Sequence, residues 1–358
     1  MVAAKTPLWT WAWPVLAWLV LVPTLLLGGG GILAAVAGIA LLGTVFAAVY
    51  HAEVVAHRVG EPFGTLVLAL AVTVIETALI VSVMLAAPAE KMGLARDTVY
   101  AVVMIVCNGI VGLCLLMGAA RYREQGFGLH GASAALAVLV ALTTLTLIFP
   151  NYASGELGPL YSTPQLIFAG FVSLVLYGSF VFIQTVRHRD DFLSAQDNDH
   201  DVHARPPTRT AVVSAGLLIV ALVAIVGLAK ALTPMVELGI ASLGVPKAVV
   251  GIIIALLVLL PESVAALKAA QSDRLQTSLN LALGSALATI GLTIPAVVAL
   301  SVAIGQPLAL GLDPADQVLL TLTLVLSVIT LGTGRTTVLQ GIVHLVIFAV
   351  YLFFAIVP

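Results

Sequence analysis

The sequence predicts an all-α polytopic membrane protein with about eleven transmembrane helices. Of its 358 residues, 61% are hydrophobic and 9% are charged, and the mean hydropathy is +1.16, far above that of a soluble domain. Fifteen Lys and Arg against 17 Asp and Glu give a net charge of −2, too balanced for a protein that follows nucleic-acid phosphates. A soluble globular protein is therefore ruled out. Membrane lipid, and not nucleic acid, is the expected partner.

Eleven stretches are long and apolar enough to cross a bilayer, because about 20 helical residues at about 1.5 Å each cover a hydrocarbon core about 30 Å thick. They run over residues 9–27, 31–50, 64–87, 98–119, 130–149, 164–186, 210–232, 247–269, 276–301, 315–331 and 336–357. Each run is apolar on every face, which indicates helices and not a β-barrel. The tenth is short and only residues 28–31 separate the first two, so a count of ten or twelve stays open.

The basic residues predict the orientation. With a cytoplasmic amino terminus, eleven of them lie in the cytoplasm: Lys5, Arg58, Arg121, Arg123, Arg187, Arg189, Arg205, Arg209, Lys268, Arg274 and Arg335. Four lie on the far side: Lys91, Arg96, Lys230 and Lys247. Cytoplasmic loops carry the excess of Lys and Arg, so the carboxyl terminus is expected on the side away from the cytoplasm.

An internal repeat organises the chain around the polar stretch 187–209, which is rich in Asp and reads as a cytoplasmic acidic linker. Glu53 is followed seven residues later by Gly60-x-Pro62, and Glu237 by Gly244-x-Pro246. The predicted parts are an extra helix in 1–30, a first repeat in 31–186, the linker in 187–209 and a second repeat in 210–358. With eleven spans the two five-helix repeats are inverted copies, an architecture that places transport sites at mid-membrane.

Each repeat carries one carboxylate deep in an apolar run, Glu76 in the third span and Glu262 in the eighth. A charge at the bilayer centre costs about 2.5 to 3.5 kcal/mol even on lenient scales. One interpretation is structural: both groups are protonated and only hold helices together. The other is functional: removal from water favours the protonated form and a bound cation favours the ionised form, so one group can hold a proton or a metal ion.

Oxygen-bearing residues on the same or neighbouring spans suit a hard cation better than zinc. The candidates beside the glutamates are Thr73, Thr77, Ser263, Asn108 and Ser285. Singly, each of these residue types is more often a packing or hydrogen-bonding feature than a ligand.

Further polar residues predict parts of a pathway. Glu53 and His57 lie four residues apart on one helical face near the cytoplasmic end, and Glu237 is the repeat partner of Glu53 at the opposite membrane face. These three residues are candidates for a pathway or proton relay. His344, in the last span, is expected to be buried, neutral and hydrogen-bonded.

No Walker loop, Gly-x-Ser-x-Gly elbow or His-Glu-x-x-His motif occurs in the sequence. An enzyme is therefore disfavoured and no cofactor is expected. Cys107 and Cys114 lie in an apolar run and are expected to pack as small apolar side chains.

The segments His51–Gly64, Thr73–Glu76 and Gly251–Glu262, followed by Gly284-Ser285-Ala286, resemble the cation/proton exchanger branch of the calcium/cation antiporter superfamily, most closely its bacterial ChaA-type members. The resemblance implies one extra helix before two inverted five-helix repeats, an inner-membrane location, and a cation held by Glu76 and Glu262. Many members carry Gly-Asn shortly before the glutamate, where this chain has Val72-Thr73 and Val258-Leu259. The preferred cation therefore stays open among Ca²⁺, Na⁺ and K⁺.

The predicted function is export of Ca²⁺, and of Na⁺ or K⁺ as further candidate substrates, in exchange for protons. A sodium/calcium exchanger is the alternative transporter, and a cation channel is a third possibility.

Overall fold

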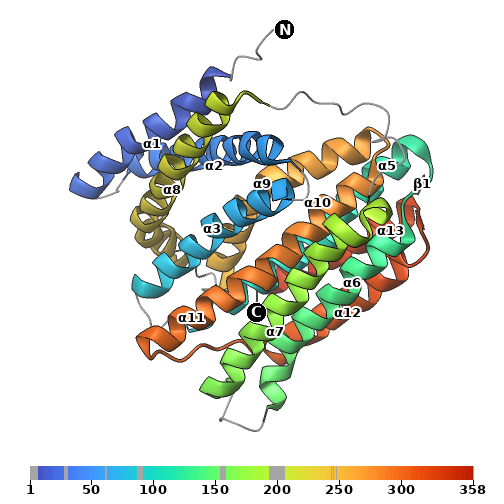
Figure 1. Cartoon of the computed structure of the whole chain (residues 1–358). Coiled ribbons are helices and arrows are strands. Elements are labelled where there is room, and N and C mark those ends of the chain that lie inside the picture. The colour runs from blue at the N-terminus through green and yellow to red at the C-terminus, as the bar shows by residue number, and fades with distance from the viewer. Residues whose placement is uncertain are drawn as a thin grey trace. The chain divides into compact units, whose positions relative to one another are not determined.

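The computed structural model describes residues 7–27, 31–60, 63–86, 92–153, 159–192, 206–242, 244, 246 and 248–357, and nearly all of them are helical (Figure 1). In this part of the chain a single two-stranded sheet pairs β1 (Gln125–Gly126) antiparallel with β2 (Arg335–Thr336). Glu61 and residues 193–205 of the predicted linker lie outside the described residues.

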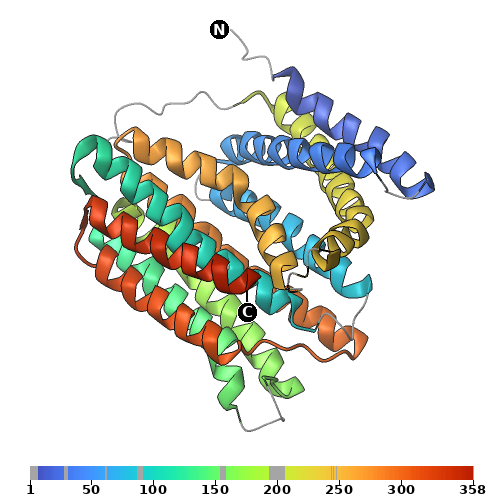
Figure 2. The same ribbon diagram turned by 180° about the vertical axis from the view of Figure 1, so that it is seen from behind.

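The chain forms two compact units. The first comprises Met1–Ala86 and His203–Gly244. It holds α1 (Leu8–Leu27), α2 (Ile32–Val59), α3 (Phe63–Ala86) and α8 (Thr208–Ser242). In this unit α1, α2 and α8 pack against one another, and α3 packs against α2 and α8 (Figures 1 and 2).

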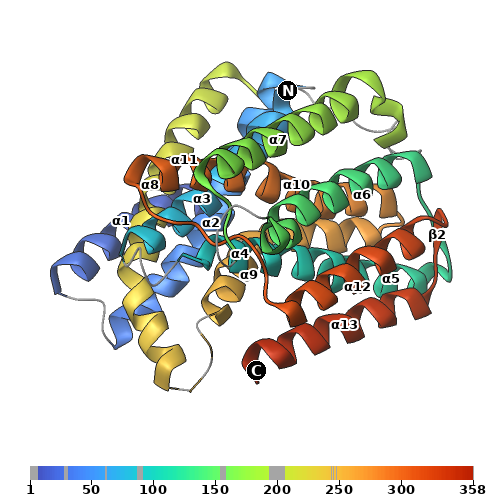
Figure 3. The same ribbon diagram turned by 90° about the horizontal axis from the view of Figure 1, so that it is seen from below.

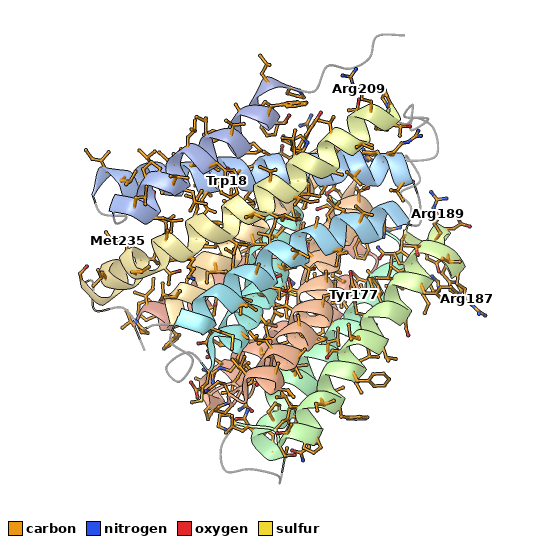
Figure 4. The ribbon with its side chains drawn as sticks, turned by 60° about the vertical axis from the view of Figure 1, so that its left-hand side comes forward. Trp18, Tyr177, Arg187, Arg189, Arg209 and Met235 are labelled. Atoms are coloured by element: carbon orange, nitrogen blue, oxygen red, sulfur yellow. The ribbon has the colours of Figure 1, made fainter. Side chains whose placement is uncertain are left out.

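Polar contacts join α1 to its neighbours in this unit. The indole N–H of Trp18 on α1 (Figure 4) donates to the Val220 carbonyl of α8 at 3.2 Å. The Thr44 hydroxyl of α2 lies 3.2 Å from the Trp13 carbonyl. A side chain at Gly43 would overlap the Trp13 ring, so a glycine permits the close approach of α1 and α2.

The second unit comprises Ala87–Val202 and Val245–Pro358. Before the linker its helical segments are α4 (Leu94–Met104), η2 (Ile105–Ile110), α5 (Val111–Tyr122), α6 (Leu129–Thr143), η3 (Thr144–Ile148), η4 (Phe149–Tyr152), α7 (Thr163–Phe182), η5 (Ile183–Arg187) and η6 (Arg189–Phe192). After the linker they are α9 (Ala248–Gln271), α10 (Leu275–Ala288), η7 (Thr289–Thr293), α11 (Ile294–Ile304), α12 (Pro314–Leu331) and α13 (Val338–Ile356). In Figure 3, α5, α12 and α13 lie near one another, and α13 packs against both of the others.

The predicted spans are confirmed as helices. Ten helical stretches of the described chain are long and apolar enough to cross a membrane, and α3 is a further helix of 24 residues with a described apolar stretch at Leu70–Val81. α1 and α2 are separate helices, as expected. The fold is therefore a nearly all-helical, multi-pass membrane fold.

Two predicted spans end too early. The stretch predicted at 31–50 is α2, which continues to Val59 and includes Glu53 and His57. The stretch predicted at 210–232 belongs to α8, which has 35 residues, about 52 Å at 1.5 Å each. Hydropathy marks only the part of a helix that is apolar, so Lys230 lies within α8 and not beyond its end.

The fourth and ninth spans are each interrupted at mid-length by a π-helix, η2 in one and η7 in the other. A π-helix shifts the hydrogen-bond register of a helix and occurs often at functional sites.

The two compact units do not coincide with the two predicted repeats. α2 and α8, the first helices of the two predicted repeats, both belong to the first unit.

Candidate functional site

Glu76 lies on α3, in the first unit, and its side chain is only 1% exposed. Thr73, three residues earlier, is also buried, and Thr77 is half-buried. Residues three apart share a helix face, so Glu76 and Thr73 present a carboxylate and a hydroxyl from one buried face. A fully ionised carboxylate at this depth requires a compensating charge or hydrogen bonds.

Glu262 lies on α9, in the second unit, and is half-buried. Pro261, directly before it, lies inside the helix and has no N–H to donate. The hydroxyl of Ser263 donates to the Leu259 carbonyl of the same helix at 2.6 Å. The Ser263 proton is therefore used within α9, while the hydroxyl oxygen keeps acceptor capacity.

The fourth span supplies Asn108, which is fully buried in η2. Its amide nitrogen donates to the Thr323 hydroxyl of α12 at 2.8 Å and approaches the Met104 sulfur at 3.8 Å. Its amide oxygen lies 3.1 Å from Nδ1 of His344 on α13. Asn108 thus joins the π-helix to two other helices of the same unit.

His344 continues this network. It is 0% exposed, and its Nε2 lies 3.1 Å from the Thr330 hydroxyl of α12. The expectation of a buried, hydrogen-bonded histidine is confirmed, but the sequence did not indicate its partners. Thr323 and Thr330 were missed as well, since a threonine in an apolar helix more often bonds its own backbone.

The ninth span brings Ser285, half-buried on α10, four residues before η7. η7 itself carries Thr289 and Thr293, both buried, which the sequence analysis did not single out. Their spacing of four residues puts the two hydroxyls on one helix face, a signal that was present in the sequence. Gly291 between them packs against Tyr177 of α7, whose side chain is marked in Figure 4.

Within the second unit, three elements that carry predicted residues pack against one another. α9 carries Glu262 and Ser263, η2 carries Asn108, and α10 carries Ser285, and each of these elements contacts the other two. Glu76, Thr73 and Thr77 belong to the first unit. The meeting of Glu76 with Glu262 stays a prediction.

The predicted pathway residues lie in the first unit. Glu53 and His57 are both exposed and lie one turn apart on α2. Glu237 belongs to α8, but its side chain lies outside the described part of the structure.

One buried histidine of this unit was missed by the sequence analysis. His51 is 0% exposed on α2, and its Nε2 lies 2.9 Å from the Thr10 carbonyl of α1. Its Nδ1 lies 3.2 Å from the Ser214 hydroxyl of α8. His51 therefore ties three helices of the first unit together, next to the exposed Glu53.

A second missed group lies at the start of α4. Arg96 pairs with Asp97 at 2.8 Å and donates to the Gly311 carbonyl at 2.9 Å. Its guanidinium thereby fastens the loop before α12 to the end of the fourth span. Tyr100 and Tyr351 stack edge to face nearby on α4 and α13, with ring centroids 5.3 Å apart.

Within the described residues, no three His, Cys, Asp or Glu side chains gather to hold a metal ion. The elements packed against α9 carry Ser285 and Asn108 instead, and hydroxyl and amide oxygens are ligands that a hard cation accepts. Cys107 and Cys114 are both buried and free, as expected.

Comparison with known proteins gives a family match over most of the chain. A family model described as sodium/calcium exchanger protein matches residues 30–186 and 213–357. The chain is 48% identical over 359 residues to the putative ionic transporter y4hA of Sinorhizobium fredii, covering 99% of this chain and 98% of the relative. It is 37% identical over 318 residues to the sodium-potassium/proton antiporter ChaA of Escherichia coli, covering 88% and 86% of the two chains.

Solved structures share the fold. The structure of native YfkE superimposes with a TM-score of 0.76 at 15% identity, covering 98% of this chain and 100% of that one. The H⁺/Ca²⁺ exchanger CAX gives a TM-score of 0.72 at 15% identity, covering 96% and 87%. At this identity the likeness concerns the arrangement of the helices.

Proposed function

Because the chain belongs to the sodium/calcium exchanger protein family, we propose that it is a secondary active antiporter that exports Ca²⁺ in exchange for protons. Na⁺ and K⁺ are further candidate substrates, supported by the relative described as a sodium-potassium/proton antiporter. The transported ions are substrates, and no cofactor is proposed.

A single observation carries the proposal: each predicted repeat places one glutamate inside a membrane-spanning helix, with oxygen-bearing side chains on the same helix or on helices packed against it. Glu76 is buried beside Thr73, and Glu262 lies on α9, which packs against the helices of Asn108 and Ser285. A carboxylate that is removed from water binds either a proton or a cation, and the two compete for it. That competition is the chemistry of exchange.

In the proposed cycle, Glu76 and Glu262 in their ionised forms hold the cation together. Thr73, Thr77, Ser263, Asn108 and Ser285 supply neutral oxygens around it. Protons that arrive from the far side displace the ion. The site, with its carboxylates protonated, then opens again to the cytoplasm and releases the protons there. Glu53 and His57 attract cations or pass protons at one mouth, and Glu237 does so at the other.

Exchange of one Ca²⁺ for two protons balances the charge. Moving Ca²⁺ alone outward against 100 mV costs about 4.6 kcal/mol, twice the cost for a single charge. Two returning protons cancel this electrical cost, and two carboxylates are enough to carry them. Rocking or sliding of one helix bundle against another would expose the site to each side in turn.

The proposed location is the inner membrane, with the amino terminus and the 187–209 linker in the cytoplasm and the carboxyl terminus on the far side. The excess of basic residues on one side supports this orientation, and two of them, Arg187 in η5 and Arg189 in η6, lie exposed beyond the end of α7 (Figure 4). Membrane lipid is the surrounding partner.

A sodium/calcium exchanger is the second candidate, because the matching family model carries that description. In that case sodium replaces the proton as the counter-ion. A channel is a weaker alternative, since it needs no site at which ions compete.

Reconstituted liposomes with a trapped pH-sensitive dye test the proposal. A Ca²⁺ gradient in sodium-free buffer is expected to drive proton movement that saturates with Ca²⁺. Ca²⁺ movement that requires sodium and leaves the pH unchanged would establish sodium/calcium exchange instead. Ohmic current without saturation would identify a channel.

A further inference from the structure

The buried network around Asn108 has a direction that fixes how its amide points. The five side chains involved, those of Met104, Asn108, Thr323, Thr330 and His344, all belong to the second unit and are at most 1% exposed. Thr323, Thr330 and His344 come from α12 and α13, so tertiary packing brings them to Asn108, whereas Met104 lies one turn before Asn108 in the same span.

Close helix contact brings His344 to this place. A Cβ atom at Gly112 of α5 would lie 3.0 Å from the His344 Cβ, and one at Gly341 of α13 would lie 2.6 Å from the Leu116 backbone nitrogen. Both approaches are tighter than ordinary side-chain contacts, so glycine at these two positions lets α13 lie against α5. His344 is thereby held beside η2.

The thioether of Met104 settles the orientation of the amide, because methionine sulfur accepts hydrogen bonds and cannot donate them. The Asn108 group that approaches this sulfur at 3.8 Å and the Thr323 hydroxyl at 2.8 Å is therefore the NH₂ end. The Thr323 hydroxyl in turn lies 3.4 Å from the same sulfur and can donate to it. Both amide hydrogens of Asn108 are thus directed at protein acceptors.

The amide oxygen of Asn108 then faces His344. An amide oxygen only accepts, so Nδ1 of His344, 3.1 Å away, must carry the ring proton. Nε2 is then the acceptor for the Thr330 hydroxyl at 3.1 Å. The hydrogen bonds run in one direction from Thr330 through His344 and Asn108 to Thr323 and Met104.

In this arrangement both amide hydrogens and one lone pair of the Asn108 oxygen are used in hydrogen bonds. The second lone pair of that oxygen is the one acceptor position that remains. A flipped amide would leave a hydrogen in that place, and a hydrogen repels a cation. η2 packs against α9, the helix of Glu262. If Asn108 supplies an oxygen to the proposed cation site, the orientation of its amide decides whether oxygen or hydrogen is offered to the ion.

We propose that His344 is a positioning residue of this transporter: its Nδ1–H holds the Asn108 amide with oxygen, and not nitrogen, left over for an ion. The inference rests on the proposed function, in which Asn108 supplies an oxygen to the cation site. It predicts that His344 sets the affinity for the cation and leaves the rate of the transport cycle nearly unchanged.

Three variants of the full-length protein test this in reconstituted liposomes. His344→Leu removes the donor and is expected to raise the KM for Ca²⁺ about tenfold with kcat within about twofold, the effect of losing one orienting hydrogen bond. His344→Gln brings back an N–H donor and is expected to return the KM to within about threefold of the parent. Leu345→Ala, the matched control, loosens the same contact with Gly112 without touching the network, and its KM is expected to stay at the parental value.

An unchanged KM in His344→Leu, an equal rise in Leu345→Ala, or no rescue by His344→Gln would overturn the proposal. A second measurement needs neither transport nor a folded variant. Nitrogen NMR of the ¹⁵N-histidine-labelled parent protein reports the tautomer of His344, and a ring proton on Nε2 would contradict the inferred direction. If the parent moves no protons in response to Ca²⁺, the proposed function fails, while the tautomer and the direct calorimetric binding of Ca²⁺ to the purified variants still decide the positioning role.

Discussion

Glu76 and Glu262 occupy matching places in the two predicted repeats, but α3 and α9 hold them differently. Glu76 is 1% exposed in a helix that has no proline, with a buried threonine three residues before it. Glu262 is half-buried, directly after a proline that removes one backbone donor. The two predicted repeats therefore share the carboxylate and differ in its surroundings.

The difference suggests unequal shares in one task. An ionised carboxylate costs more free energy the further it is removed from water. Glu76 is 1% exposed and Glu262 is half-buried. We therefore expect the Glu76 carboxylate to depend more strongly than the Glu262 carboxylate on a bound ion or proton for its stability. The expected outcomes below test this asymmetry.

The largest expected effect comes from Glu76→Gln. In the proposed site the charge partner of Glu76 is the bound cation, and removing one partner of a buried charge pair costs about 3 to 5 kcal/mol. Ca²⁺-driven proton movement is therefore expected to fall at least about a hundredfold. Flux into liposomes containing a pH dye measures it, with protein content and orientation matched between samples. Near-normal exchange would show that Glu76 only holds helices together.

Shortening each carboxylate by one methylene compares the roles of Glu76 and Glu262. Glu76→Asp withdraws the carboxylate by one methylene from a closed environment, and displacements of about 1 Å at such sites cost up to about a hundredfold. Glu262→Asp, at a half-buried position, is expected to lose about ten times less activity than Glu76→Asp. The same flux assay compares them. Equal losses, or the reverse order, would remove the asymmetry between α3 and α9.

Packing of α9 is expected to affect stability more than chemistry. A Cβ atom at Gly251 would lie 3.1 Å from the backbone of Asp97 and Thr98, which cannot move aside. Gly251→Val is expected to lower the free energy of unfolding by about 1 to 3 kcal/mol. Thermal unfolding in detergent measures it.

The matched control for this substitution is Gly178→Ala on α7, where an added Cβ meets nothing within 4 Å. It is expected to be neutral or to stabilise by up to about 1 kcal/mol, because alanine is the better helix former. A loss of stability in the control as large as that of Gly251→Val would show that close packing of α4 and α9 is not the cause.

The smallest expected effect is that of Glu53→Gln. Glu53 is exposed on α2, so it acts on ions through a screened field and contributes about twofold to the apparent KM for Ca²⁺. The difference is expected to vanish when ionic strength is raised. A loss as large as that of Glu76→Gln would place Glu53 in the binding site itself.

Hydropathy was enough to predict the number and approximate position of the membrane-spanning helices. The predicted spans are helices, and the resemblance to cation/proton exchangers is confirmed at the level of the family. The ends of α2 and α8 were misjudged because polar residues such as Glu53 and Lys230 continue a helix beyond its apolar part. The π-helices η2 and η7 escaped notice because a shift of one residue in backbone bonding leaves no mark on hydropathy.

The site was predictable only in part. A carboxylate in an apolar run has few interpretations, so Glu76 and Glu262 stand out from the sequence. The partners of Asn108 do not, because Thr323 and His344 come from spans more than 200 residues away and reach it only through helix packing. His51 escaped for the same reason, since its partners lie on α1 and α8.

The competition between metal and proton can be measured directly on the purified protein. Ca²⁺ added to the detergent-solubilised chain in weakly buffered solution is expected to release up to about two protons per bound ion, since binding requires ionised carboxylates. The Glu76→Gln, Glu262→Gln double variant is expected to release none. Undiminished proton release from that variant would contradict the account, because protons would then leave from groups other than the two glutamates.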